Sequence, residues 1–117
     1  MLSFEGKRIY LACGATDMRK QMNGLMTLVE SSFSLNPFDD AVFIFCNRNR
    51  DRLKLLVWDG DGFWLCFKRL EKGRFRWPGL GDAPTMTLSE QELSVLLSGV
   101  KVELKLKRNE VLERNIS

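Results

Sequence analysis

The sequence contains no histidine, and this absence excludes several classes of enzyme. Without an imidazole there is no Ser–His or Cys–His nucleophile pair, no histidine general base and no zinc site that uses histidine. The three cysteines, Cys13, Cys46 and Cys66, are widely spaced and are flanked by apolar or small residues. We expect buried free thiols, and neither a disulfide, a catalytic thiol, a metal site nor a cofactor.

Long apolar runs are also lacking. No run approaches the roughly 20 residues that a membrane-spanning helix needs, and the first seven residues lack the apolar stretch of a signal peptide. We therefore expect a cytoplasmic protein without membrane contact. A length of 117 residues, with 44% hydrophobic and 28% charged residues, suits one globular domain. We expect a single α+β domain over residues 1–100 and a charged, partly disordered tail over 101–117.

Close pairs of carboxylates, which two-metal nucleases use, are few. Asp39 and Asp40 follow Pro37 in an expected loop, and Asp59 and Asp61 lie in a glycine-rich turn, where aspartate is favoured for backbone reasons. An enzyme, such as a nuclease, is therefore the least favoured functional class.

The hydrophobic pattern predicts alternating strands and helices in the first half of the chain. A short apolar run at 9–13 predicts a strand, and the spacing of apolar residues predicts a helix over 17–33 with Thr16 as its N-cap. The continuous apolar run at 41–46 predicts a central strand that is covered on both faces.

The second half contains the strongest hairpin signal. Two β-prone runs at 52–58 and 63–69 flank an Asp-Gly-Asp-Gly turn, and residues 70–77 could add an edge strand or an ordered arm. Ser89 and Glu92 form a capping box for a second helix that ends before Gly99.

Alternation of apolar and charged residues at 102–106 suggests one more strand. The order of elements predicts an α+β fold: a mainly antiparallel sheet of four to five strands with two helices packed on one face.

Basic residues gather in one part of the chain. The formal net charge is +3, yet the segment from Asn47 to Trp77 carries +5 and the remainder carries −2. Such a field attracts polyanions, with a solvated surface as the alternative. The nine cations of this segment are Arg48, Arg50, Arg52, Lys54, Lys68, Arg69, Lys72, Arg74 and Arg76.

One face of the predicted hairpin combines cations with aromatic rings. If the hairpin closes symmetrically about residues 60 and 61, side-chain alternation places these residues on one face: Trp58, Phe63, Phe67, Arg52, Lys54 and Arg69. Cations neutralise phosphates and rings stack on unpaired bases, so this face is a candidate nucleic-acid platform. The alternative is a half-buried hairpin whose cations only keep its outer face soluble. A one-residue slip in register would scatter the group.

The segment Lys68–Pro78 is denser still in cations. It contains five cations in eleven residues, with Phe75 and Trp77 interleaved and Gly73 for flexibility. Arginine is favoured for bidentate phosphate contacts. We expect an arm that lies along a phosphate backbone, again with a solvated edge as the alternative.

Several stretches resemble the TnpB-type accessory proteins of the insertion sequence sixty-six family, which are unrelated to the RNA-guided nuclease of the same label. The longer blocks are Tyr10–Lys20 and Phe43–Pro78. Within the second block, Trp58–Phe63 (WDGDGF) and Lys68–Phe75 (KRLEKGRF) are the most specific stretches. The likeness covers most of the chain, from about residue 9 to residue 100. It implies an element that encodes a separate, larger transposase together with small accessory proteins needed for full transposition.

Three functional hypotheses follow. The first is a DNA-binding accessory factor that contacts the backbone of element ends through the basic hairpin and arm. The second is an interaction module that docks the transposase or a sister accessory protein, with Trp58, Phe63, Trp77 and Leu80 as anchors. Phe67 and Phe75 are further candidates for such contacts. The third is an enzyme.

Overall fold

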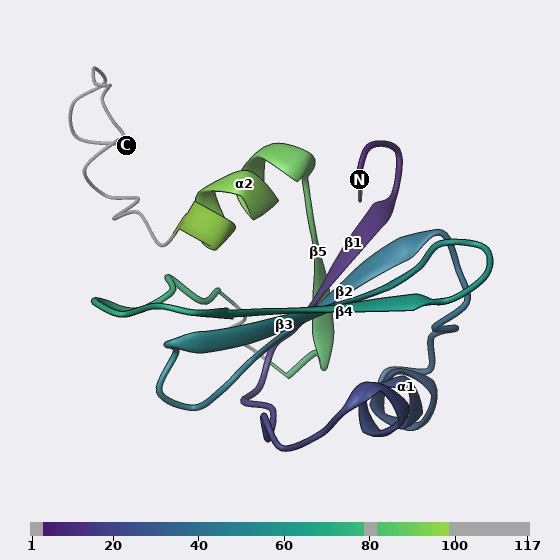
Figure 1. Cartoon of the computed structure of the whole chain (residues 1–117), viewed down its shortest axis with the longest axis horizontal. Coiled ribbons are helices and arrows are strands. Elements are labelled where there is room, and N and C mark those ends of the chain that lie inside the picture. Colours follow the sequence, from purple (N-terminus) through teal and green to yellow (C-terminus); the bar gives the residue numbers. More distant parts are fainter. Residues whose placement is uncertain (1–3, 79–81, 99–117) are drawn as a thin grey trace.

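The computed structural model describes residues 4–78 and 82–98 (Figure 1). In chain order the elements are β1 (Arg8–Ala12), α1 (Met22–Ser31), β2 (Ala41–Cys46), β3 (Arg52–Trp58), β4 (Phe63–Arg69), β5 (Thr85–Leu88) and α2 (Glu90–Ser98). The expected strand at 102–106, the expected tail and Leu80 lie outside the described residues. No helix of the described part is long and apolar enough to cross a membrane.

The strands form one sheet in the order β4-β3-β2-β1-β5 (Figure 1). Strands β1 and β2 pair in parallel, whereas the other three pairings are antiparallel. The predicted α+β class with a mainly antiparallel sheet is confirmed.

The two helices lie on opposite faces of this sheet, so the expectation that both pack on one face was wrong (Figure 1). Leu25 of α1 packs with Phe43 and Phe45, whereas Leu93 of α2 packs with Ile44. Alternate residues of a strand point to opposite faces, and every residue of β2 is buried. A strand that is apolar on both faces requires a cover on each side.

Helix α1 begins five residues later than the periodicity predicts, and Thr16 does not cap it. Thr16 is buried, and its backbone N–H donates to the Cys46 carbonyl at 2.7 Å, which ties this segment to the end of β2. The Asp17 carboxylate accepts from the backbone N–H of Arg19 at 2.9 Å and also from its guanidinium. These contacts fold residues 17–20 into a turn and compete with helix formation.

Lys54 lies in the middle of β3 and is 7% exposed. Its ammonium donates to the carbonyl of Met18 at 2.9 Å and to the carbonyl of Lys20 at 2.8 Å. A buried charge is tolerated when it is hydrogen-bonded in this way. Lys54 therefore anchors the segment before α1 to the face of the sheet.

The predicted hairpin is confirmed, including its register. Trp58 pairs with Phe63 at the turn and Arg52 pairs with Arg69 at the open end. The Asp59 N–H donates to the Gly62 carbonyl at 3.0 Å, and Gly60 adopts φ +100°. Glycine is suited to this left-handed backbone position because it has no Cβ.

The capping box of α2 is confirmed, but β5 was not predicted. The Ser89 N–H donates to the Glu92 carboxylate at 2.8 Å, and the Glu92 N–H donates to the Ser89 hydroxyl at 3.0 Å. Strand β5 has four residues and pairs antiparallel with β1. Four residues are too few for the alternation of apolar and polar side chains that identifies a strand in the sequence.

Replacing Lys54 with methionine should lower the free energy of unfolding by about 2 kcal/mol, because two carbonyl oxygens lose their charged donor. Urea denaturation followed by circular dichroism measures the change. Lys20→Met is the matched control, since the Lys20 side chain is exposed. Equal stability of the two variants would show that the buried ammonium does not hold the segment.

Candidate nucleic-acid interface

Topology brings most of the cations to one end of the sheet. Strand β3 runs antiparallel to both β2 and β4, so the C-terminal ends of β2 and β4 lie beside the start of β3. The loop after β2 and the segment after β4 continue from this end. We call it the basic end; its cations are Arg48, Arg50, Arg52, Arg69, Lys72, Arg74 and Arg76.

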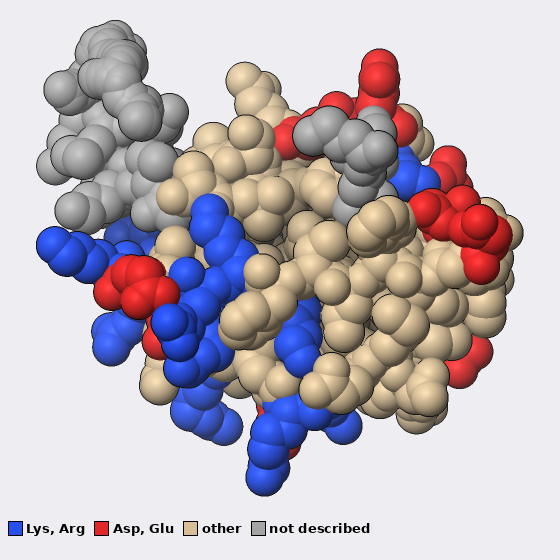
Figure 2. Space-filling view, in the orientation of Figure 1, with Lys and Arg blue, Asp and Glu red and all other residues tan. Residues whose placement is uncertain are grey.

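Four acidic residues lie at the opposite end, where Lys7 and Arg8 lie as well. The β3–β4 turn and the residues before β2 lie there, and we call this the acidic end; its members are Asp39, Asp40, Asp59 and Asp61. Figure 2 shows Lys and Arg gathered toward the left and the bottom, and Asp and Glu mainly on the right. The molecule is therefore electrically polarised along its strands.

The loop between β2 and β3 is closed by the side chain of Asn47. Its carbonyl oxygen accepts the N–H groups of Asp51 at 3.1 Å and Arg52 at 3.0 Å, and its amide donates to the Asp51 carboxylate at 2.7 Å. The bond from Asn47 lowers the pKa of Asp51. Arg48 is exposed on this loop and has no hydrogen bond or ion pair to another described residue.

Residues 70–78 form an ordered arm rather than an edge strand. The N–H of Phe75 donates to the Arg50 carbonyl at 2.7 Å, and the Arg50 guanidinium donates to the Trp77 carbonyl at 2.9 Å. The indole N–H of Trp77 donates to the Ala12 carbonyl at 2.9 Å. The arm is thus bonded both to the β2–β3 loop and to β1.

This docking corrects the roles expected for Phe75 and Trp77. Phe75 is 2% exposed and Trp77 is 8% exposed, so neither ring is free to stack on a base or to anchor a partner. The neighbouring cations, Arg74 and Arg76, are exposed. The interleaved aromatic residues attach the arm to the core, and the cations face solvent.

Three cations of the basic end border a common shallow pocket. Arg50, Arg74 and Arg76 line it together with Pro78 and the two buried rings, and its volume is about 530 Å³. Lys72 lies nearby on the arm, is exposed, and has no hydrogen bond or ion pair to another described residue. The structure thus brings three cations from two segments of the chain to one pocket.

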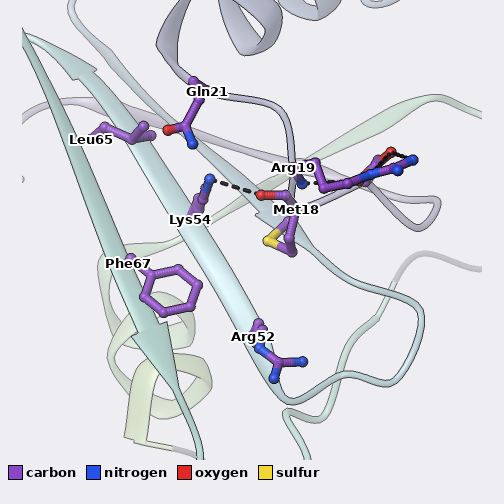
Figure 3. A pocket seen from close by; sticks show the side chains of 8 residues that line it. Met18, Arg19, Gln21, Arg52, Lys54, Leu65 and Phe67 are labelled. Atoms are coloured by element: carbon purple, nitrogen blue, oxygen red, sulfur yellow. Dashed lines mark hydrogen bonds and ion pairs between the residues drawn. The ribbon is translucent and has the colours of Figure 1, made fainter.

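A second groove lies on the α1 face between β4 and the segment before α1 (Figure 3). It has a volume of about 760 Å³, and Phe67, Arg52 and Arg19 line its walls. Arg19 is paired with Asp17 at 2.7 Å, and this hydrogen bond lowers the pKa of Asp17 to about 2. Phe67 is 56% exposed and is the one ring of the predicted platform that is open to solvent.

Three other members of the predicted platform are less accessible, although Lys54 lines the same groove as Phe67 and Arg52. Lys54 is buried and bonded to carbonyls. Trp58 and Phe63 are half-buried at the acidic end, where their ring centroids lie 5.0 and 5.1 Å from that of Phe38. The hairpin register was correct, but Lys54 and the two rings near the turn are covered, so Phe67 and Arg69 are the exposed members of the predicted platform.

Carboxylates offset part of the positive charge. Arg69 bonds to Glu71 at 3.0 Å, and Arg52 lies 3.6 Å from Asp51. Lys68 points to the other face of the hairpin and donates to the Leu97 carbonyl at the end of α2. Because each lies beside a carboxylate, Arg52 and Arg69 contribute less to the electric field of the basic end than Arg48, Lys72 and Arg74 do.

The exposed Trp64 was missed as a surface residue. Sequence alternation assigns it to the core face of the hairpin, yet it is 48% exposed and its indole N–H donates to Asp59 at 2.5 Å. Strand β4 is the last strand of the sheet, so its side chains have neighbours on one side only. Position in the sheet order, which the local sequence does not reveal, decides this exposure.

The cysteines are free thiols, as predicted, although Cys46 alone is fully buried. Burial raises the pKa of Cys46 to about 11 and also raises that of Cys66. A nucleophilic thiol needs a shift in the opposite direction. Within residues 4–78 and 82–98, no three Cys, Asp or Glu side chains are grouped in a way that would hold a metal ion.

Comparison with known proteins gives a consistent result. The family model described as IS66 Orf2 like protein matches residues 7–107. Two uncharacterized proteins of Sinorhizobium fredii, y4hO and y4jC, are 39% and 38% identical to the chain. The alignments cover 84% of both chains for y4hO, and 81% of this chain and 80% of the relative for y4jC. No solved structure matches the chain.

Trp77→Phe should lower the free energy of unfolding by about 1 kcal/mol, because the Ala12 carbonyl loses its donor while most of the apolar packing is kept. Trp64→Phe is the matched control and should have a smaller effect, since the Trp64 ring is half exposed. Both are measured by urea denaturation. A larger loss for Trp64→Phe than for Trp77→Phe would contradict the docked arm.

Proposed function

The chain belongs to the IS66 Orf2-like family of insertion-sequence accessory proteins, and from this premise we propose that it supports DNA transposition by binding the DNA backbone through its basic end. The role is non-catalytic. Transposition requires a transposase, and we propose the element's transposase and a sister accessory protein as further partners. Both relatives are bacterial proteins, and bacterial DNA lies in the cytoplasm, so we propose a cytoplasmic location for this protein as well.

The observation that carries this proposal is the convergence of cations on an ordered surface. Arg50, Arg74 and Arg76 border one pocket. Arg48 lies two residues before Arg50 on the loop, and Lys72 lies two residues before Arg74 on the arm. Cations that neutralise phosphates release condensed counterions, which supplies the salt-dependent part of DNA affinity. The arm and the loop are already bonded to each other, so little ordering accompanies binding.

The helices and loops of this fold favour contacts with the DNA backbone over contacts with base edges. A recognition helix lies in the major groove and presents polar and basic side chains to base edges. Helix α1 contains Glu30 and no cation, and α2 contains Glu90 and Glu92 and no cation. Both would be repelled by phosphates. The cations lie instead on a loop and an arm, where they meet the phosphate chain.

The alternative role, an interaction module without DNA contact, loses most of its expected anchors. Trp77 and Phe75 are buried, and Trp58 and Phe63 are half-buried in a ring cluster with Phe38. Direct contact with DNA is therefore the better supported function.

Arg48→Ala combined with Arg74→Ala should weaken binding to duplex DNA roughly tenfold at moderate salt and reduce the slope of log affinity against log salt by about two, because two phosphate contacts are lost. Fluorescence anisotropy over a salt series measures both quantities. The loss should be equal for element-end DNA and for unrelated DNA of the same length, since backbone contacts do not depend on sequence.

Lys7→Ala combined with Arg8→Ala is the matched control, because it removes the same formal charge beside the acidic end, where Lys7 pairs with Asp40. This control should leave the slope nearly unchanged. Equal slopes for both double variants and the parent protein would refute binding through the basic end.

A further inference from the structure

Strand β4 is an unpaired edge of the sheet. Two bonds fix the phase of its hydrogen bonding with β3: Asp59 N–H to the Gly62 carbonyl at 3.0 Å, and Leu70 N–H to the Asp51 carbonyl at 2.8 Å. Even-numbered residues of β4 therefore bond to β3. Backbone groups of odd-numbered residues, from Phe63 to Arg69, point outward, and no strand of the described part pairs with them.

Exposed edge strands of monomeric proteins tend to be short or charged. The β4 edge is not short, and only part of it is charged. It is seven residues long and carries Trp64, 48% exposed, and Phe67, 56% exposed. These two rings lie on opposite faces of the strand, because one residue number is even and the other odd. A strand added along the edge would cover both.

The charges beside this edge are self-complementary. The edge faces the viewer in Figures 1 and 2, with the basic end on the left, the acidic end on the right and mainly uncharged surface between them. A two-fold rotation about an axis through the middle of this surface exchanges left and right. It therefore places the basic end of one copy beside the acidic end of another, an arrangement favoured by electrostatics.

We propose that β4 pairs antiparallel with β4 of a second copy of this chain, about a two-fold axis that passes through Cys66, and so forms a continuous ten-stranded sheet. This is the register in which all seven residues of both strands overlap. It sets Phe63 opposite Arg69 of the second copy and Trp64 opposite Lys68, so that cations meet rings and like charges are kept apart.

The middle of the interface is apolar in this register. Leu65 lies opposite Phe67 of the second copy on the α1 face, and Cys66 lies opposite Cys66 on the α2 face. Because Cys66 bonds to β3, the two cysteines form a non-hydrogen-bonded pair, in which Cα atoms are about 4.5 Å apart. This separation is within the range that a disulfide spans.

The first test is oxidation of the full chain with diamide, followed by mapping of linked cysteines by mass spectrometry. We expect a covalent dimer joined through Cys66 and its absence from Cys66→Ser. A dimer joined through other cysteines, or one that persists in Cys66→Ser, would overturn the proposed register.

The second test measures association without a cross-link, by sedimentation equilibrium of the reduced protein over a range of concentrations. The Phe67→Lys variant places a cation opposite Leu65 twice in the symmetric interface, and we expect it to raise the dissociation constant of the dimer roughly tenfold or more. It should also abolish the Cys66 cross-link, which separates specific pairing from random collision.

Thr87→Lys is the matched control, since it adds the same charge to an exposed residue of β5 at the other edge of the sheet. It should leave the dimer intact, and the melting temperatures of both variants show that each is folded. A parent protein that is monomeric at all concentrations, or equal weakening by both variants, would overturn the proposal. DNA binding by a monomer would leave the proposed function untouched.

Discussion

A strand that is buried on both faces is the constraint on which the rest of the molecule depends. All six residues of β2 are buried, with Phe43 and Phe45 on one side and Val42 and Ile44 on the other. Burial of large apolar side chains is the dominant favourable contribution to folding, so both faces must be covered. Helix α1 covers one face and α2, with the docked arm, covers the other. The polar loops therefore lie at the two ends of the sheet, with the clustered cations at the basic end and the clustered aspartates at the acidic end.

The sequence predicts those parts of the fold whose signal is local. The hairpin and its register follow from β-prone runs around a glycine-rich turn, and the Ser89 and Glu92 capping box is a three-residue pattern. Helix α1 was predicted too long because its apolar spacing extends into residues 17–21. A bond to the distant Cys46 carbonyl and the local Asp17–Arg19 contact stop the helix there. Competition between such contacts is not visible in periodicity.

The candidate site shows the same division between local and distant information. Cations that cluster along the chain also lie toward one end of the sheet, because β2, β3 and β4 meet at that end. Whether an individual side chain is buried or exposed depends on hydrogen-bond partners that are far away in the sequence. Lys54 is bonded to carbonyls 34 and 36 positions away, and Trp77 to a carbonyl 65 positions away. Alternating rings and cations identify a segment with two faces, but not which face is turned inward.

Under the proposed DNA binding, the bonds between the β2–β3 loop and the arm have a consequence for how the basic end would meet a duplex. The Arg50 guanidinium holds the Trp77 carbonyl, and the Trp77 indole holds β1, so the spacing of the exposed arginines is set by the protein core. A surface of fixed geometry cannot follow the contour of every duplex. DNA bound in the proposed way would have to bend or adjust its groove width to match, and the energy of that deformation differs between sequences. A protein that touches no base can in this way still favour some stretches of DNA over others, through their stiffness.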